Sequence, residues 1–179
     1  MIDPVTTQRI GFRAAYLGIA VFLLFVQILP LDLEPVRLPW PDFILLITFV
    51  WVLRRPDFVT GLMIAAVFFA EDLVTMRPPG LWTALVLLAT EFLRSREAIL
   101  RDMPFALEWA VAAGLVLVVS VIDWLVLALF MVPQAEFALV LTQTLTTVLA
   151  YPLVAGLSRA AFRARRSTRA EPGGFGQRP

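Results

Sequence analysis

Six apolar stretches follow one another along the chain and are separated by charged residues and prolines. Apolar runs that are bounded in this way predict helices. The sequence therefore predicts an all-α protein with six helices, and the stretches cover residues 14–31, 43–53, 58–70, 80–93, 104–132 and 137–157.

The length of each stretch bears on whether it can cross a membrane. A helix needs about 20 residues to cross a hydrocarbon core of about 30 Å. The first, fifth and sixth stretches are long enough. The second and fourth have strictly apolar runs of only eleven residues, 43–53 and 80–90, so they would cross only if the bilayer thins or their flanking residues snorkel. A re-entrant hairpin of the second and third stretches is the alternative, and the sequence leaves it open.

Composition places these helices in a membrane. Of the 179 residues, 60% are hydrophobic and only 16% are charged, and the mean hydropathy is +0.84. Soluble domains are about 45–50% apolar, and so few charges cannot cover a soluble core. Arg9 and Arg13 precede an apolar run that is longer than a signal-peptide core and has no small-x-small cleavage site. We therefore expect an integral membrane protein whose first helix is retained, with one transmembrane bundle over residues 1–158.

The arginines predict the orientation of this bundle. All fifteen basic residues are arginine. If the N-terminus is cytoplasmic and each stretch crosses once, only Arg37 and Arg77 fall outside. The thirteen others fall inside: Arg9, Arg13, Arg54, Arg55, Arg94, Arg96, Arg101, Arg159, Arg163, Arg165, Arg166, Arg169 and Arg178. Cytoplasmic loops carry such an excess, so we expect a six-helix inner-membrane protein with both termini in the cytoplasm.

The last part of the chain, residues 159–179, differs from the bundle. It begins with a run of arginines and ends in a segment rich in glycine and proline, Glu171–Pro179, which predicts a cytoplasmic tail that is disordered at its end. Arginines beside anionic headgroups anchor a helix end by about 1 kcal/mol each. A docking surface for a cytoplasmic protein is the alternative. No nucleic-acid motif accompanies the basic run.

Several residue types are missing, and their absence excludes most enzyme chemistry. The chain has no His, Cys or Lys. Without them it cannot form a disulfide, a thiol nucleophile, the usual zinc and haem sites, a Schiff base or a Walker A lysine. We therefore expect no metal, no cofactor and no enzymatic activity.

A few polar or small residues inside the apolar stretches are candidates for contacts. An acid at mid-bilayer, as we expect Asp123 to be, costs about 2.5–3.5 kcal/mol. It should therefore be protonated or paired with Ser120, or lie in a subunit contact. Glu71 and Asp72 are expected at the outer membrane boundary. Two further patterns predict helix–helix contacts: a polar stripe of Gln143, Thr147 and Tyr151 in the sixth helix, and a small-residue face of Gly61, Ala65, Ala66 and Ala70 in the third.

The segment 40–94 carries a family resemblance. Its motifs are Pro41-Asp42 before the second helix, Gly61 at the start of the third, Asp72-Leu73 at its end and Gly80-Leu81 before the fourth. With the length, the six spans and the basic tail, these motifs resemble the rod-shape-determining protein MreD, a family that often has an acid at the position of Asp123. Pro78-Pro79-Gly80 departs mildly from the commoner Pro-Leu-Gly.

The resemblance implies a non-enzymatic scaffold for cell-shape control in the bacterial wall-elongation machinery. Its direct partner would be an MreC-like single-span protein. Through that partner it would couple an actin-like MreB filament to a RodA-like glycosyltransferase and its transpeptidase. The candidate partner-binding residues are Gly61, Ala65, Asp72, Pro79, Gly80 and Asp123.

Two other functions compete with this one. A small-molecule-binding membrane subunit of an uptake transporter fits the size, but it should gather polar groups at the outer face, where the charges of this chain resemble loop charges. An intramembrane aspartyl enzyme would use Asp72 and Asp123, yet the motifs around the acids of such enzymes are absent. The proteins that stay attached after gentle detergent extraction would distinguish the scaffold from the transporter subunit.

Overall fold

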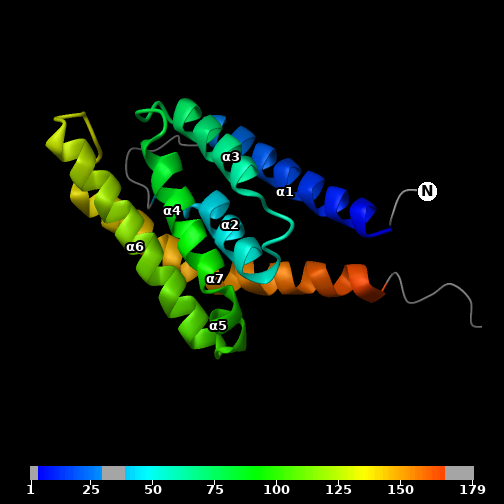
Figure 1. Ribbon diagram of the computed structural model, residues 1–179. Coiled ribbons are helices and arrows are strands. Elements are labelled where there is room, and N and C mark those ends of the chain that lie inside the picture. Colours follow the sequence, from blue (N-terminus) through cyan, green and yellow to red (C-terminus); the bar gives the residue numbers. More distant parts are fainter. Residues whose placement is uncertain (1–3, 30–38, 168–179) are drawn as a thin grey trace, which may run out of the picture.

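The computed structural model describes residues 4–29 and 39–167, with side chains for residues 9–29, 39–100 and 103–161. Every regular element in this part of the chain is a helix (Figure 1). The seven helices are α1 (Pro4–Ile28), α2 (Phe43–Arg54), α3 (Gly61–Val74), α4 (Leu81–Ser95), α5 (Glu97–Asp102), α6 (Phe105–Leu129) and α7 (Phe137–Ser167). The predicted loop charges Asp32, Glu34 and Arg37 and the predicted disordered end Glu171–Pro179 lie outside the described residues.

Three of the described helices are long and apolar enough to cross a membrane. They are α1, α6 and α7, through the segments Arg9–Ile28, Phe105–Leu129 and Phe137–Ala161. Large apolar side chains stay exposed on α6 and α7, including Leu117, Leu125, Leu129, Leu145, Leu149, Leu153 and Leu157. Apolar surface on this scale marks a membrane or partner contact. The prediction of an all-helical fold is confirmed for the described residues, and three of its helices could cross a membrane, while six crossings and the orientation stay a prediction.

The short helix α2 lies at the centre of the bundle. Nine of its twelve residues are buried, and it packs against α1, α4, α5 and α7. A helix that is apolar on all sides is typical of a core position. The composition of α2 is therefore explained by burial in protein and does not require contact with lipid. At 1.5 Å per residue α2 is about 18 Å long, so the prediction of a short second helix is confirmed.

Helix α5 was not predicted. Its six residues follow Arg96 directly and end before Pro104, in a segment that we interpreted as a charged cytoplasmic loop. Leu100 is buried in the core while Ile99 is exposed, and the helix packs against α2, α4 and α6. One buried leucine in a charged segment of this length is too weak a pattern to predict a helix.

The connections between helices gather at two opposite ends of the bundle (Figure 1). The start of α1, the α2–α3 turn, α5 and the far part of α7 lie at one end, which we call the arginine-rich end. There Phe12 of α1 stacks on Phe58 with ring centroids 4.7 Å apart, and Arg94 donates a 3.0 Å hydrogen bond to the Val59 carbonyl. The start of α2, the α3–α4 turn and the α6–α7 turn lie at the other end, which we call the cavity end.

Candidate functional site

Two adjoining cavities lie at the cavity end. The first, of about 250 Å³, lies among the start of α2, the α3–α4 turn, α4, α6, the α6–α7 turn and α7, and we call it the α6-side cavity. The second, of about 320 Å³, is lined by α1, the start of α2, α3 and α7, and we call it the α1-side cavity. The two share four lining residues, Asp42, Thr75, Arg77 and Gln143.

Asp42 stands at the junction of the two cavities because it caps α2. Its Oδ1 accepts a 2.9 Å hydrogen bond from the Leu45 amide, which satisfies one of the free donors at the start of the helix. Its own amide donates to Thr147 Oγ1 at 3.0 Å, so the start of α2 is tied to α7. Burial raises the pKa of the Asp42 carboxyl above its ordinary value, and the Leu45 amide and the charge of Arg77 oppose this rise.

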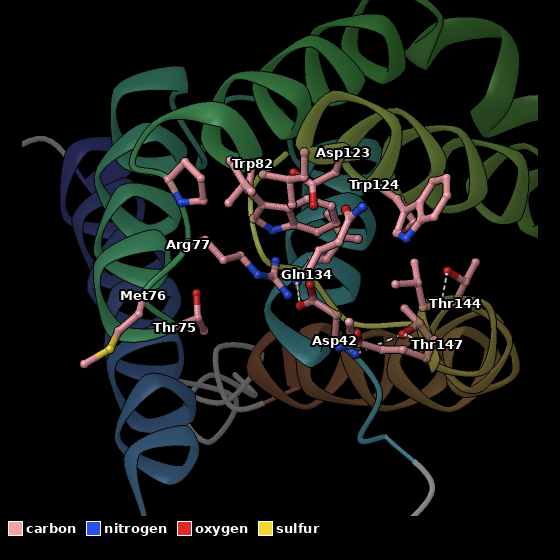
Figure 2. A pocket seen from close by; sticks show the side chains of 18 of the residues that line it. Asp42, Thr75, Met76, Arg77, Trp82, Asp123, Trp124, Gln134, Thr144 and Thr147 are labelled. Atoms are coloured by element: carbon pink, nitrogen blue, oxygen red, sulfur yellow. Dashed lines mark hydrogen bonds between the residues drawn. The ribbon is translucent and has the colours of Figure 1, made fainter. Parts of the chain in front are cut away.

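Arg77 is the arginine of the α3–α4 turn, and it lines both cavities. Met76 has a positive φ of 53°, and the Arg77 amide donates to the Asp72 carbonyl at 3.0 Å. This left-handed turn ends α3. The guanidinium then lies 5.1 Å from the centre of the Trp82 ring, and Figure 2 shows it reaching in toward Asp42.

Asp123 lines the α6-side cavity together with Ser120 and Trp124 of the same helix. Figure 2 shows its carboxyl near Trp82 at the cavity. Asp123 lies six residues before the end of α6 at Leu129, and its depth in the bilayer stays a prediction. Within the described residues no hydrogen bond joins it to Ser120.

Four buried polar atoms around the cavities have no hydrogen-bond partner among the described residues. Trp82 Nε1, Trp124 Nε1 and Gln134 Oε1 belong to residues of the α6-side cavity, and Glu71 Oε2 belongs to the α1-side cavity. Trp82 is 5% exposed and Glu71 is 3% exposed. The other carboxylate oxygen of Glu71 accepts a 3.4 Å hydrogen bond from Gln27. Glu71 is thus an acid buried in protein at the cavity end, and its place at the outer membrane boundary stays a prediction.

Asp72 has a structural role in the α3–α4 turn. It is fully buried, and its Oδ2 accepts 2.8 Å hydrogen bonds from the Gly80 amide and from Thr83 Oγ1, with the Thr83 amide at 3.4 Å. Gly80 has φ +97°, a conformation that strongly favours glycine. Asp72 and Gly80, two of the predicted site residues, are therefore brought together, with the exposed Pro79 beside them. Asp72 lines neither cavity.

Gly61 and Ala65 lie elsewhere, on α3. Gly61 begins this helix at the arginine-rich end, and a Cβ atom added there meets nothing within 4 Å. Their neighbour Leu62 is 83% exposed. The expected close packing of another described helix against Gly61 is therefore absent, and the small-residue face is open at this position.

The sequence interpretation missed Glu108. This acid is buried in the first turn of α6, and Arg54 Nη2 donates to its two oxygens at 3.0 and 3.3 Å. Tyr151 donates to it at 3.0 Å, and Arg159 is 3.8 Å away. We call these four residues the Glu108 cluster. An acid inside a long apolar stretch was the available signal, as it was for Asp123 in the same stretch.

The polar stripe of α7 makes contacts at both ends of the bundle. Gln143 lines both cavities and Thr147 bonds the Asp42 amide, while Tyr151 belongs to the Glu108 cluster. The prediction that this stripe makes interhelical hydrogen bonds is confirmed for Thr147 and Tyr151.

No group of three or more acidic, His or Cys residues that could hold a metal occurs within residues 4–29 and 39–167. In comparisons with known proteins, no family model, no curated protein and no solved structure matches this chain.

Proposed function

We propose that this chain is a non-enzymatic scaffold of the bacterial wall-elongation complex, as the resemblance to MreD implies. It binds an MreC-like single-span protein within the inner membrane. Through that protein it links an MreB-like filament to a RodA-like glycosyltransferase and its transpeptidase. The α3–α4 turn gives this proposal some support, because the hydrogen bonds of Asp72 to Gly80 and Thr83 connect two of the motifs on which the resemblance rests.

The scaffold is proposed to cross the membrane six times with both termini in the cytoplasm. Two observations support this topology. The described turns lie at alternating ends of the bundle, with the α2–α3 turn and α5 at one end and the α3–α4 and α6–α7 turns at the other. The thirteen arginines predicted inside include Arg54, Arg55, Arg94 and Arg159 at the arginine-rich end. Cytoplasmic sides carry the arginine excess, so the cavity end faces the periplasm.

The open small-residue face of α3 is the observation that carries the scaffold proposal furthest. Helices in lipid gain little from hydrophobic association and rely on close packing at small residues. Gly61 has free space where its side chain would be, and Ala65 lies one turn further along α3. A partner's single transmembrane helix can approach closely at these two residues.

Co-purification tests this proposal. We expect Gly61→Leu and Ala65→Leu to lower the amount of MreC-like protein recovered per unit of this protein several-fold, because the larger side chains hold the partner helix away. Gly156→Leu is the matched control, since Gly156 is exposed on α7 and also has free space around it. Membrane abundance is matched for all variants. Equal recovery with all three variants, or failure to recover such a partner from the wild type, would contradict the proposal.

A small-molecule-binding subunit of an uptake transporter is the second candidate. The observation that favours it is the pair of adjoining cavities. Asp42, Glu71 and Arg77, which the sequence suggested were loop charges, line these cavities instead. The same co-purification distinguishes the candidates, because a transporter subunit would be recovered with an ATPase-coupled membrane core and without wall-synthesis proteins.

A further inference from the structure

The α6-side cavity has the size and the wall chemistry of a site for a small polar molecule. Its volume of about 250 Å³ is several times the roughly 30 Å³ that one water occupies in the liquid, and it approaches the roughly 300–1,000 Å³ typical of ligand pockets. Its walls combine apolar residues of α6 and α7 with charged groups from three separate parts of the chain (Figure 2).

The walls offer hydrogen-bond donors without partners. Trp82 and Trp124 each have an indole N–H whose hydrogen bond no described residue accepts. Trp82 itself is buried, with 5% of its surface exposed. A buried donor without a partner is unfavourable, so a ligand that accepts its hydrogen bond gains affinity. The guanidinium of Arg77 lies beside Trp82 and adds a positive charge. Arginine and indole N–H groups together suit a phosphate or carboxylate.

The same walls offer acceptors. Asp42 and Asp123 both line the cavity. One oxygen of Asp42 caps α2, while no described residue donates a hydrogen bond to Asp123. Gln134 Oε1 has no partner either. Carboxylates next to aromatic rings are the usual surroundings of an ammonium group.

We propose that the α6-side cavity binds a small zwitterion, a molecule that carries an ammonium group and a phosphate or carboxylate a few ångströms apart. The ammonium group contacts Asp42 and Asp123, and the anionic group contacts Arg77 and the indole N–H groups. An anion alone would meet two carboxylates, and a cation alone would meet Arg77. Only a ligand with both charges matches both sets of groups.

Two sources supply this chemistry. One is the headgroup of an aminophospholipid such as phosphatidylethanolamine, and the other is a free amino acid or aminoalkyl phosphate. Tryptophan is enriched at membrane surfaces, so Trp82 and Trp124 in the wall favour a lipid headgroup. The inference does not rest on the scaffold proposal, because it uses only the cavity and its walls.

The experiment uses the full-length protein in nanodiscs of phosphatidylglycerol, with or without phosphatidylethanolamine. Native mass spectrometry counts retained lipid, and the tryptophan fluorescence follows titration with phosphoethanolamine. Ethanolamine and glycerol phosphate are the cation-only and anion-only controls. We expect the zwitterion to bind at least tenfold more tightly than either control, in the lipid form, the free form or both.

Variants test the assignment of the two charged ends. We expect Asp123→Asn and Arg77→Gln each to weaken binding about tenfold, which corresponds to about 1.4 kcal/mol. Glu136→Gln is the matched control, because Glu136 is an exposed acid of the same α6–α7 turn that does not line the cavity. Ala135→Trp fills the cavity from the turn without removing a charge, and it should also weaken binding. The melting temperature of each variant shows whether it is folded.

Each outcome has a definite meaning. Retention of phosphatidylethanolamine alone supports the site with a lipid as ligand, and binding of free phosphoethanolamine alone supports it with a solute. Equal binding of the zwitterion and both controls would overturn the proposal. An equal loss of binding in Glu136→Gln and in the Asp123 and Arg77 variants would also overturn it. No binding of lipid or solute in any measurement would mean that the cavity holds only water, and would overturn it as well.

Discussion

At the scale of single residues, two aspartates have different surroundings and therefore different roles. Asp72 accepts three hydrogen bonds within one turn. Asp123 lines a cavity and, within the described chain, accepts none. The two acids that an aspartyl enzyme would pair therefore differ in their surroundings, since Asp72 lines neither cavity. This difference supports our proposal that Asp72 is a structural residue.

Asp72 gives a direct test of that role. We expect Asp72→Ala to lower the free energy of unfolding by about 1–3 kcal/mol, because the Gly80 amide and Thr83 lose a buried acceptor. Asp72→Asn keeps an acceptor oxygen and should cost much less. Unfolding in a mild detergent measures both, with the exposed Asp57→Ala as a control that should change little. If Asp72→Asn folds normally and binds its partner but loses function, the aspartyl enzyme becomes the better hypothesis.

At the scale of elements, the Glu108 cluster joins three helices. Arg54 ends α2, Glu108 begins α6, and Tyr151 and Arg159 belong to α7. The ring of Phe105 lies 4.7 Å below the Arg159 guanidinium. Removing one partner of a buried ion pair leaves the other charge uncompensated, whereas replacing both with apolar residues is often neutral.

A pair of variants tests this cluster. We expect Glu108→Leu to destabilise the protein, by less than the about 3–5 kcal/mol of a fully buried pair, because Arg54, whose side chain is 23% exposed, loses its main partner. The double variant Arg54→Met/Glu108→Leu should recover a large part of that loss. Thermal unfolding of the single and double variants measures the coupling, with Glu91→Leu on the surface of α4 as the control. Costs that simply add would show that the two residues do not act as a pair.

The sequence predicted elements better than it predicted contacts. Each of the six apolar stretches contains a helix, because apolar length and proline boundaries are local signals. The burial of Glu71 and the gathering of Asp42, Arg77 and Asp123 depend on how turns direct residues that are far apart in sequence. The left-handed turn at Met76 directs Arg77 to the cavities, and no local sequence pattern predicts this. Glu108 was different, since an acid in an apolar stretch was visible there and was overlooked.

At the scale of the whole molecule, the short central helix does not need to reach both membrane surfaces. Backbone at membrane depth is tolerated where protein surrounds it. The start of α2 is bonded to Thr147 of α7, and its last residue, Arg54, is bonded to Glu108 of α6. Since longer helices bond to α2 at both its ends, a helix of about 18 Å fits inside a bundle whose outer helices are long enough to cross the bilayer.

The two ends of the bundle differ in chemistry, and this difference is the basis of the account. The Glu108 cluster and most of the described arginines lie at one end, and the two cavities lie at the other. The proposed topology places the arginine-rich end in the cytoplasm and the cavity end in the periplasm. The central claim is therefore the six-crossing topology with this orientation.

Single-cysteine labelling tests this claim most directly, because the chain has no cysteine of its own. Met76 and Met131 are 94% and 92% exposed at the cavity end, and Asp57 and Ser95 are exposed at the arginine-rich end. We predict that a membrane-impermeant maleimide labels Met76→Cys and Met131→Cys in cells whose outer membrane alone is opened. Asp57→Cys and Ser95→Cys should react only after the inner membrane is opened as well. Labelling of Asp57→Cys together with Met131→Cys from outside would contradict the six-crossing account.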